Sequence, residues 1–408
     1  MKAIRKIIAT PTLLALTDQA VCSGTNFLLI LFLAQRLSIS HFGIYASVLL
    51  IVYLIMSVNN AIVIQPFQVF ISKIESPKGY LTALLIGEIL FLTALAILLR
   101  SIMWLLPASL FLFQDYFALA VFTGGFIIND FFRKILLGIA ETKIAIAVDI
   151  LFLLLLAFMA LKKQWDLNEI LYGIGWANLI ALTPALSYFA KNCQKPTHWK
   201  TYWQKHVAEG KWLLSTAVLQ WCSSNFFVLV SGIYIGVQAL GVLRLVQSFF
   251  GIINVGLQVV ENYFLPKIAR MYNEDRILAK KQLRAMSVNG AWIMGILLLL
   301  LFMFSSPIII AIGGAQYQEY GYVVKIMSVL YFFIFLGYPV RIAIRIQLLN
   351  RIFFLGYGFS FLTSVLTFHF LLKFWGLSGA ISGLVINQLT MILYWQYQLG
   401  KKQFQLWK

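Results

Sequence analysis

Long apolar runs separated by short polar and basic connections follow one another along the whole chain. A bilayer span needs about 20 mostly apolar residues, and the runs that meet this length are 13–34, 42–66, 80–99, 115–132, 144–161, 169–190, 210–233, 241–264, 286–304, 319–340, 352–372 and 376–399. The run at 115–132 meets this requirement least well, because it carries Gly124, Gly125, Asn129 and Asp130. The pattern predicts an all-α polytopic membrane protein with about twelve transmembrane helices.

Composition supports a membrane protein and excludes several other classes. Only 11% of the residues are charged and 61% are hydrophobic, whereas soluble domains carry about 25% charged residues. The net charge of +18 does not indicate nucleic-acid binding, because the basic residues lie in short connections between apolar runs rather than on one soluble face. Three cysteines and four scattered histidines form no disulfide framework, metal cluster or catalytic motif, so we expect no enzyme activity, metal or cofactor.

Basic residues are distributed unevenly between alternate connections. With the N-terminus in the cytoplasm, the cytoplasmic connections receive the great majority of the 32 Lys and Arg residues. This count includes Arg133, Arg341 and Arg345, which are interpreted as loop residues near span ends. The positive-inside rule therefore predicts that both termini are cytoplasmic.

The two halves of the chain resemble each other. Cys22-Ser-Gly-Thr-Asn-Phe27 recurs as Cys222-Ser-Ser-Asn-Phe226, and Gly43, Pro66, Arg133 and Trp165 have counterparts at Gly241, Pro266, Arg341 and Trp375. The spacing stays near 200 residues, in unchanged order, which is typical of an internal repeat. We expect two six-helix lobes, 1–190 and 210–408, joined by a basic linker at 191–209. An even number of spans makes this a parallel repeat.

Asp18-Gln-Ala-Val-Cys-Ser-Gly-Thr-Asn-Phe27, Leu33-Ala-Gln-Arg36 and Phe42-Gly-Ile-Tyr45 resemble segments of polysaccharide-transport proteins. These are the O-antigen and exopolysaccharide flippases of the multidrug/oligosaccharidyl-lipid/polysaccharide (MOP) exporter superfamily. The resemblance implies a MATE-like, V-shaped fold in a bacterial inner membrane. It also implies alternating access for a polyprenyl-phosphate-linked glycan, with a polysaccharide polymerase and glycosyltransferases as partners.

Ionisable residues inside spans are costly and therefore mark functional sites. In the first span, Asp18 lies on a polar stripe with Asn26, and Asn60 extends this surface from the second span. The stripe either faces a cavity or forms a polar seam between helices. Asp18 is a candidate for carrying a coupling proton or cation, with Glu88 and Asp149 as rivals or as structural partners of neighbouring helices.

The eighth span carries a second polar face. Arg244, Gln247 and Gln258 lie on one side of it, and Lys325 lies near the outer end of the tenth span. A cavity-facing Arg244 would bind a phosphate or a uronate carboxylate with two parallel hydrogen bonds. Both cations have an alternative role, which is to reach the outer headgroups by snorkelling.

Three functions remain open at this point. A flippase for a lipid-linked oligosaccharide is the favoured hypothesis. A multidrug exporter shares the expected fold, but cationic drugs would avoid a cavity with two cations. A membrane-embedded glycan polymerase or ligase usually needs a large outer loop, and the outer connections here are short and apolar.

Overall fold

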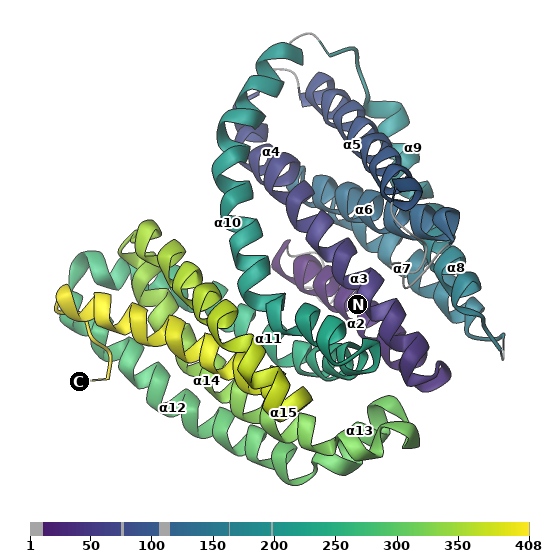
Figure 1. The fold of residues 1–408 in the computed structure, drawn as a ribbon. Coiled ribbons are helices and arrows are strands. Elements are labelled where there is room, and N and C mark those ends of the chain that lie inside the picture. The colour runs from purple at the N-terminus through teal and green to yellow at the C-terminus, as the bar shows by residue number, and fades with distance from the viewer. Residues whose placement is uncertain (1–10, 75–76, 106–114, 163, 197–198, 408) are drawn as a thin grey trace, which may run out of the picture. The chain divides into compact units, whose positions relative to one another are not determined.

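The computed structural model describes residues 11–74, 77–105, 115–162, 164–196 and 199–407, and this part of the chain is helical throughout, without strands. The basic N-terminal residues lie outside the described residues. In chain order the long helices are α2 (Pro11–Arg36), α3 (Ile39–Asn59), α5 (Pro77–Leu105), α6 (Tyr116–Gly138), α7 (Thr142–Met159), α8 (Leu167–Ala181), α9 (Thr183–Asn192), α10 (Trp199–Tyr234), α11 (Val237–Glu274), α12 (Arg276–Met303), α14 (Gly321–Ile346) and α15 (Asn350–Lys401) (Figure 1). Shorter elements are η1 (Asn60–Ile64), α4 (Gln65–Phe70), η2 (Ile71–Lys73), α13 (Ser305–Gly313) and η4 (Ala315–Tyr320).

The predicted spans correspond to helices. Ten helical segments among the described residues are long and apolar enough to cross a membrane. Helix α6 is not in this group, and its polar and charged C-terminal half explains why. Helix α15 contains both of the last two predicted spans, which meet at Gly376, where φ is 49° and ψ is −128°. Glycine tolerates this conformation because it has no Cβ. The prediction of an all-α polytopic membrane protein is confirmed.

The chain divides into two compact units. The first unit comprises Met1–Leu29 and Val48–Val218, and the second comprises Ile30–Ser47 and Leu219–Lys408. The boundary thus lies within α10, and residues 199–209, which we assigned to the linker, form its first turns. The ends of α2 and α3 that meet at 30–47 belong to the second unit, where Gln316 Nε2 donates hydrogen bonds of 2.9 Å to the carbonyl oxygens of Ala34 and Leu37.

In the first unit, glycines bring α6 and α8 into close contact. A Cβ built on Gly125 would lie 2.6 Å from the carbonyl oxygen of Gly175, and one built on Gly175 would lie 2.7 Å from the carbonyl oxygen of Val121. Only glycine permits this approach, as is common where membrane helices pack. The close packing holds α6, which carries Arg133, in the interior of the unit.

Irregular backbone interrupts the second span. The π-helix η1 precedes Pro66 in α4, and proline has no N–H with which to continue the helical hydrogen bonds. The carbonyl oxygen of Ile62 instead accepts a hydrogen bond of 3.0 Å from Nδ1 of His206 in α10. The buried His206 ring also lies 2.6 Å from the hydroxyl of Tyr80, so the irregular segment is bound to two other helices.

Candidate functional site

The first unit contains a buried cluster of charged residues centred on Arg133 of α6. Its Nε donates a hydrogen bond of 3.0 Å to Asp149 of α7, and its Nη2 donates to Asp18 of α2. Both aspartates are at least nine-tenths buried. One guanidinium therefore joins three helices and neutralises one of the two carboxylates.

A second ion pair lies one turn away on the same helix. Asp130 accepts a hydrogen bond of 2.7 Å from Lys134 at the i,i+4 spacing. With Asp18, Asp149 and Arg133, the group holds three carboxylates and two cations and therefore carries one formal negative charge. A cation or proton is the charge that would compensate it.

A small cavity of about 80 Å³ opens beside this cluster. It is lined by Cys22, Thr25, Asn26, Tyr53, Met56, Phe126, Asn129, Asp130, Arg133, Asp149, Phe152 and Asn178. Asn26 belongs to the predicted polar stripe, so part of the stripe does face a cavity. The cavity is large enough for a small ion and water but not for a sugar ring.

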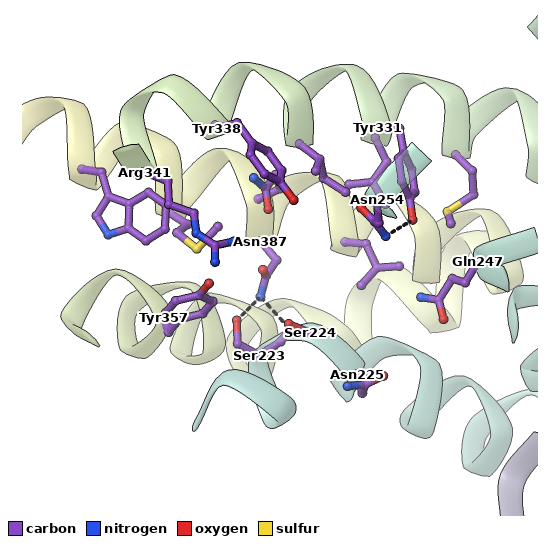
Figure 2. A pocket seen from close by; sticks show the side chains of 18 of the residues that line it. Ser223, Ser224, Asn225, Gln247, Asn254, Tyr331, Tyr338, Arg341, Tyr357 and Asn387 are labelled. Carbon is purple, nitrogen blue, oxygen red and sulfur yellow. Dashed lines mark hydrogen bonds between the residues drawn. The ribbon is translucent and has the colours of Figure 1, made fainter. Parts of the chain in front are cut away.

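The second unit contains a larger pocket of about 420 Å³. Its lining includes Ser223, Ser224 and Asn225 from α10; Arg244, Gln247, Ser248 and Asn254 from α11; Tyr331, Tyr338 and Arg341 from α14; and Tyr357, Asn387, Gln388 and Trp395 from α15. Tyr338, Arg341 and Tyr357 lie at one end of the pocket, and Gln247, Asn254 and Tyr331 lie at the other (Figure 2). Hydroxyls, amides, aromatic rings and guanidinium groups thus share one surface.

Hydrogen bonds fix the orientation of several of these side chains. Asn387 Nδ2 donates to the Ser223 carbonyl oxygen at 3.2 Å (Figure 2). The same nitrogen donates to Ser364 Oγ at 2.7 Å. Asn254 donates to the Tyr331 hydroxyl at 2.8 Å. Such bonds hold polar groups in place before a ligand binds, which reduces the entropy cost of binding.

Both charged residues that line this pocket are arginines, Arg244 and Arg341. Arg244 Nη1 donates a hydrogen bond of 3.2 Å to Gln247. Arg341 lies 3.4 Å from the buried Glu261, which also bonds Arg345. Two arginines therefore share one carboxylate there. The pocket therefore suits an anionic ligand, while the amides and tyrosines suit the hydroxyl groups and ring faces of a sugar.

The structure places the predicted residues in different surroundings. Arg244 and Gln247 line the second unit's pocket, whereas the exposed Gln258 and Lys325 are not among its lining residues. The ammonium of Lys325 lies 5.8 Å from the ring centre of Phe302. Asn60 opens the π-helix η1.

The three predicted coupling carboxylates separate into two groups. Asp18 and Asp149 meet at Arg133, while Glu88 lies apart from them and accepts a hydrogen bond from Asn59. Asp18 and Asn26, treated as one stripe in the sequence, therefore contact different partners, since Asn26 bonds the Cys22 carbonyl oxygen of its own helix.

The interpretation of Arg133, Arg341 and Arg345 as loop residues is wrong. All three lie within helices and pair with buried carboxylates. Their position near span ends made them look like topology determinants. The repeat carries a signal for this pairing, because Arg133 and Arg341 are counterparts and each contacts a buried acid in its own unit.

Known proteins were compared with the chain by sequence and by structure. No protein-family model matches it, and no curated protein matches it in sequence. The structure of lipid II flippase MurJ in an inward closed conformation matches with a TM-score of 0.71 and 13% identity, over 97% of this chain and 88% of that one. An inward-facing multidrug resistance MATE family transporter of the MOP superfamily matches with a TM-score of 0.70 and 13% identity, over 97% and 94% of the two chains.

A MATE transporter of Vibrio cholerae, VcmN in a mutant form, matches with a TM-score of 0.61 and 14% identity, over 94% of this chain and 95% of that chain. Identities this low establish the fold and not the substrate. The chain is a multi-pass helical membrane protein with the fold that MurJ and the MATE transporters share.

Proposed function

We infer that this protein is an exporter that moves an anionic, lipid-linked glycan across the bacterial inner membrane by alternating access. The observation that carries this proposal is the pocket of the second unit, in which Arg244 and Arg341 lie among amides, hydroxyls and aromatic rings. A phosphate or uronate group would pair with the guanidinium groups, and sugar hydroxyls would bond the amides. One structural neighbour is named a lipid II flippase, which agrees with a lipid-borne substrate.

We assign the coupling of transport to an ion gradient to the first unit. Its cluster around Arg133 has one formal negative charge in excess, and the adjoining cavity of about 80 Å³ admits only a small ion. A cation or proton bound there would neutralise the cluster. Because this charge has the opposite sign to that of the pocket, we assign the driving ion to the first unit and the glycan to the second.

A multidrug exporter is the second candidate, since MATE transporters share the fold. The typical drug cation would be repelled by Arg244 and Arg341. A glycan polymerase or ligase has less support, because the pocket offers binding groups without a nucleophile paired to a base. Both termini are assigned to the cytoplasm, and glycosyltransferases and a polysaccharide polymerase are the expected partners.

The test uses the full-length protein in proteoliposomes that contain a fluorescent polyprenyl-diphosphate oligosaccharide with a uronate residue. Exposure of the sugar to an impermeant lectin reports its movement, with and without an imposed proton or sodium gradient. We expect gradient-dependent movement that is lost in the double variant Arg244→Gln, Arg341→Gln and kept in Lys325→Gln. Transport of a cationic dye, with no movement of the glycan, would instead favour the multidrug exporter.

A further inference from the structure

One buried carboxyl group in the first unit has no cationic partner among the residues that the structure describes, unlike the other buried carboxylates. Glu88 of α5 is 1% exposed, and its contact is with Asn59, the last residue of α3, which is also 1% exposed. Asn59 Nδ2 donates to Glu88 Oε1 at 3.0 Å. By contrast, Asp18 and Asp149 share Arg133, and Glu261 bonds Arg345.

The other two oxygen atoms of this pair have no hydrogen-bond partner among the described residues. They are Glu88 Oε2 and Asn59 Oδ1, and both are buried. Two acceptors cannot bond each other, and a buried acceptor without a donor is costly. An ionised Glu88 would leave both oxygens unsatisfied and would also bury an unpaired charge, which proteins avoid by neutralising the group.

A single proton resolves all of these costs. A protonated carboxyl group has one O–H donor, and a proton on Glu88 Oε2 would donate to Asn59 Oδ1. Together with the observed bond from Asn59 Nδ2 to Glu88 Oε1, this closes the eight-membered ring of an acid–amide pair. A metal cation fits less well, because the pair offers two oxygen atoms and hard cations take about six or more.

We propose that Glu88 and Asn59 form a proton-binding site, separate from the Arg133 cluster. In this site a protonated Glu88 is joined to the Asn59 amide by two hydrogen bonds. The proton comes from the aqueous phase and returns to it, and no other bond changes. Among neighbouring charged groups, Asp130 of α6 acts on Glu88 electrostatically. Asp130 is itself paired with Lys134.

The position of this site connects it to movement of the second span. Asn59 lies directly before the π-helix η1, a type of element that is rare and that frequently occurs at functional sites. The hydrogen-bonded pair of Glu88 and Asn59 joins α3 to α5 at that point. When the proton leaves, Glu88 loses the O–H group that donates to Asn59 Oδ1. The carboxylate that remains carries a negative charge, which must contact water or a cation. Proton release therefore favours a change at η1.

Infrared spectroscopy of the reconstituted full-length protein tests the site without relying on transport. A protonated carboxyl group gives a C=O stretching band that ionised carboxylates lack, and the band shifts in D₂O and on ¹³C labelling of glutamate. At neutral pH we expect this band in the wild-type protein, its loss in Glu88→Gln, and its retention in Asp18→Asn and Asp149→Asn, which serve as controls. In Asn59→Ala the band should move to higher wavenumber, because the carbonyl oxygen loses its hydrogen-bond donor.

Two results would overturn the proposal. An unchanged band in Glu88→Gln would show that Glu88 is ionised in the wild-type protein. A band that stays at the same wavenumber in Asn59→Ala would show that the acid is not hydrogen-bonded to the amide. If Glu88→Gln fails to fold, labelling decides instead. A wild-type band that does not shift with ¹³C-glutamate does not arise from a glutamic acid, which equally excludes the site.

Discussion

Gly43 of α3 and Gly241 of α11 pack backbone against backbone within the second unit. A Cβ built on Gly241 would lie 2.9 Å from the Cα of Gly43, and one built on Gly43 would overlap the carbonyl group of Val237. A hydrogen bond of 2.8 Å from Gln238 Nε2 to Ser40 Oγ lies close by in sequence. The two glycines are counterparts in the internal repeat, so equivalent positions of the two halves meet at this contact.

Replacing Gly43 by valine should destabilise the protein, because the added side chain has no room beside Val237. Overpacking of this kind typically costs about 1–3 kcal/mol, and thermal unfolding in detergent measures it. Gly251→Ala in α11 is the matched control, since a Cβ there meets nothing within 4 Å. An equal loss of stability in both variants would mean that the close contact does not limit stability.

Arg133→Gln should be strongly destabilising, since it leaves Asp18 and Asp149 buried without a cation. Breaking a buried ion pair from one side costs about 3–5 kcal/mol. Lys162→Gln removes one partner of the solvent-exposed ion pair with Glu169, in which the two charged atoms lie 2.7 Å apart, and should change stability little because solvent screens exposed pairs. Melting temperatures of the two purified variants compare these losses, and similar values would contradict a structural role for the cluster.

Asp18→Asn tests the coupling role of the cluster more gently. The amide keeps the shape of the side chain but removes its charge, so the protein should still insert and fold. We expect glycan movement in proteoliposomes to fall and to lose its dependence on the imposed gradient. If the variant still responds to the gradient, Asp18 is not the coupling group.

Arg244→Lys should weaken binding of an anionic sugar, because lysine cannot form the two parallel hydrogen bonds of a guanidinium. Hydrogen bonds to charged groups contribute about 1.5–3 kcal/mol, so the affinity for a uronate oligosaccharide should fall by about tenfold or more. Isothermal titration calorimetry measures this change. Lys325→Arg, outside the pocket lining, should leave the affinity unchanged, and an equal effect in both variants would place the sugar elsewhere.

The orientation of the chain in the membrane can be measured directly. A reporter fused after Lys205 should be cytoplasmic, and one fused after Lys162 should lie outside, because basic residues collect in the connections assigned to the cytoplasm. Activity of paired alkaline phosphatase and fluorescent-protein fusions gives the side of each site. Both reporters on one side would contradict the predicted alternation of spans.

The sequence alone determined the membrane class and the helical segments. A bilayer requires long apolar helices, so the hydropathy along the sequence is sufficient to identify the spans. The break between the last two spans could also be predicted, and the structure places it at Gly376. Single residues such as Asp18, Glu88 and Arg244 stood out because charge inside an apolar run is rare.

Only the tertiary structure decided which of these residues meet. Arg133 and Asp149 lie on neighbouring helices, and Asp18 reaches them from α2, but hydropathy has no information about which helix faces contact one another. For the same reason, hydropathy could not predict that Arg341 lines the pocket or that Asn59 lies beside Glu88. Side-chain pairing depends on helix rotation and close packing between segments distant in sequence, and the periodicity of one segment cannot specify either.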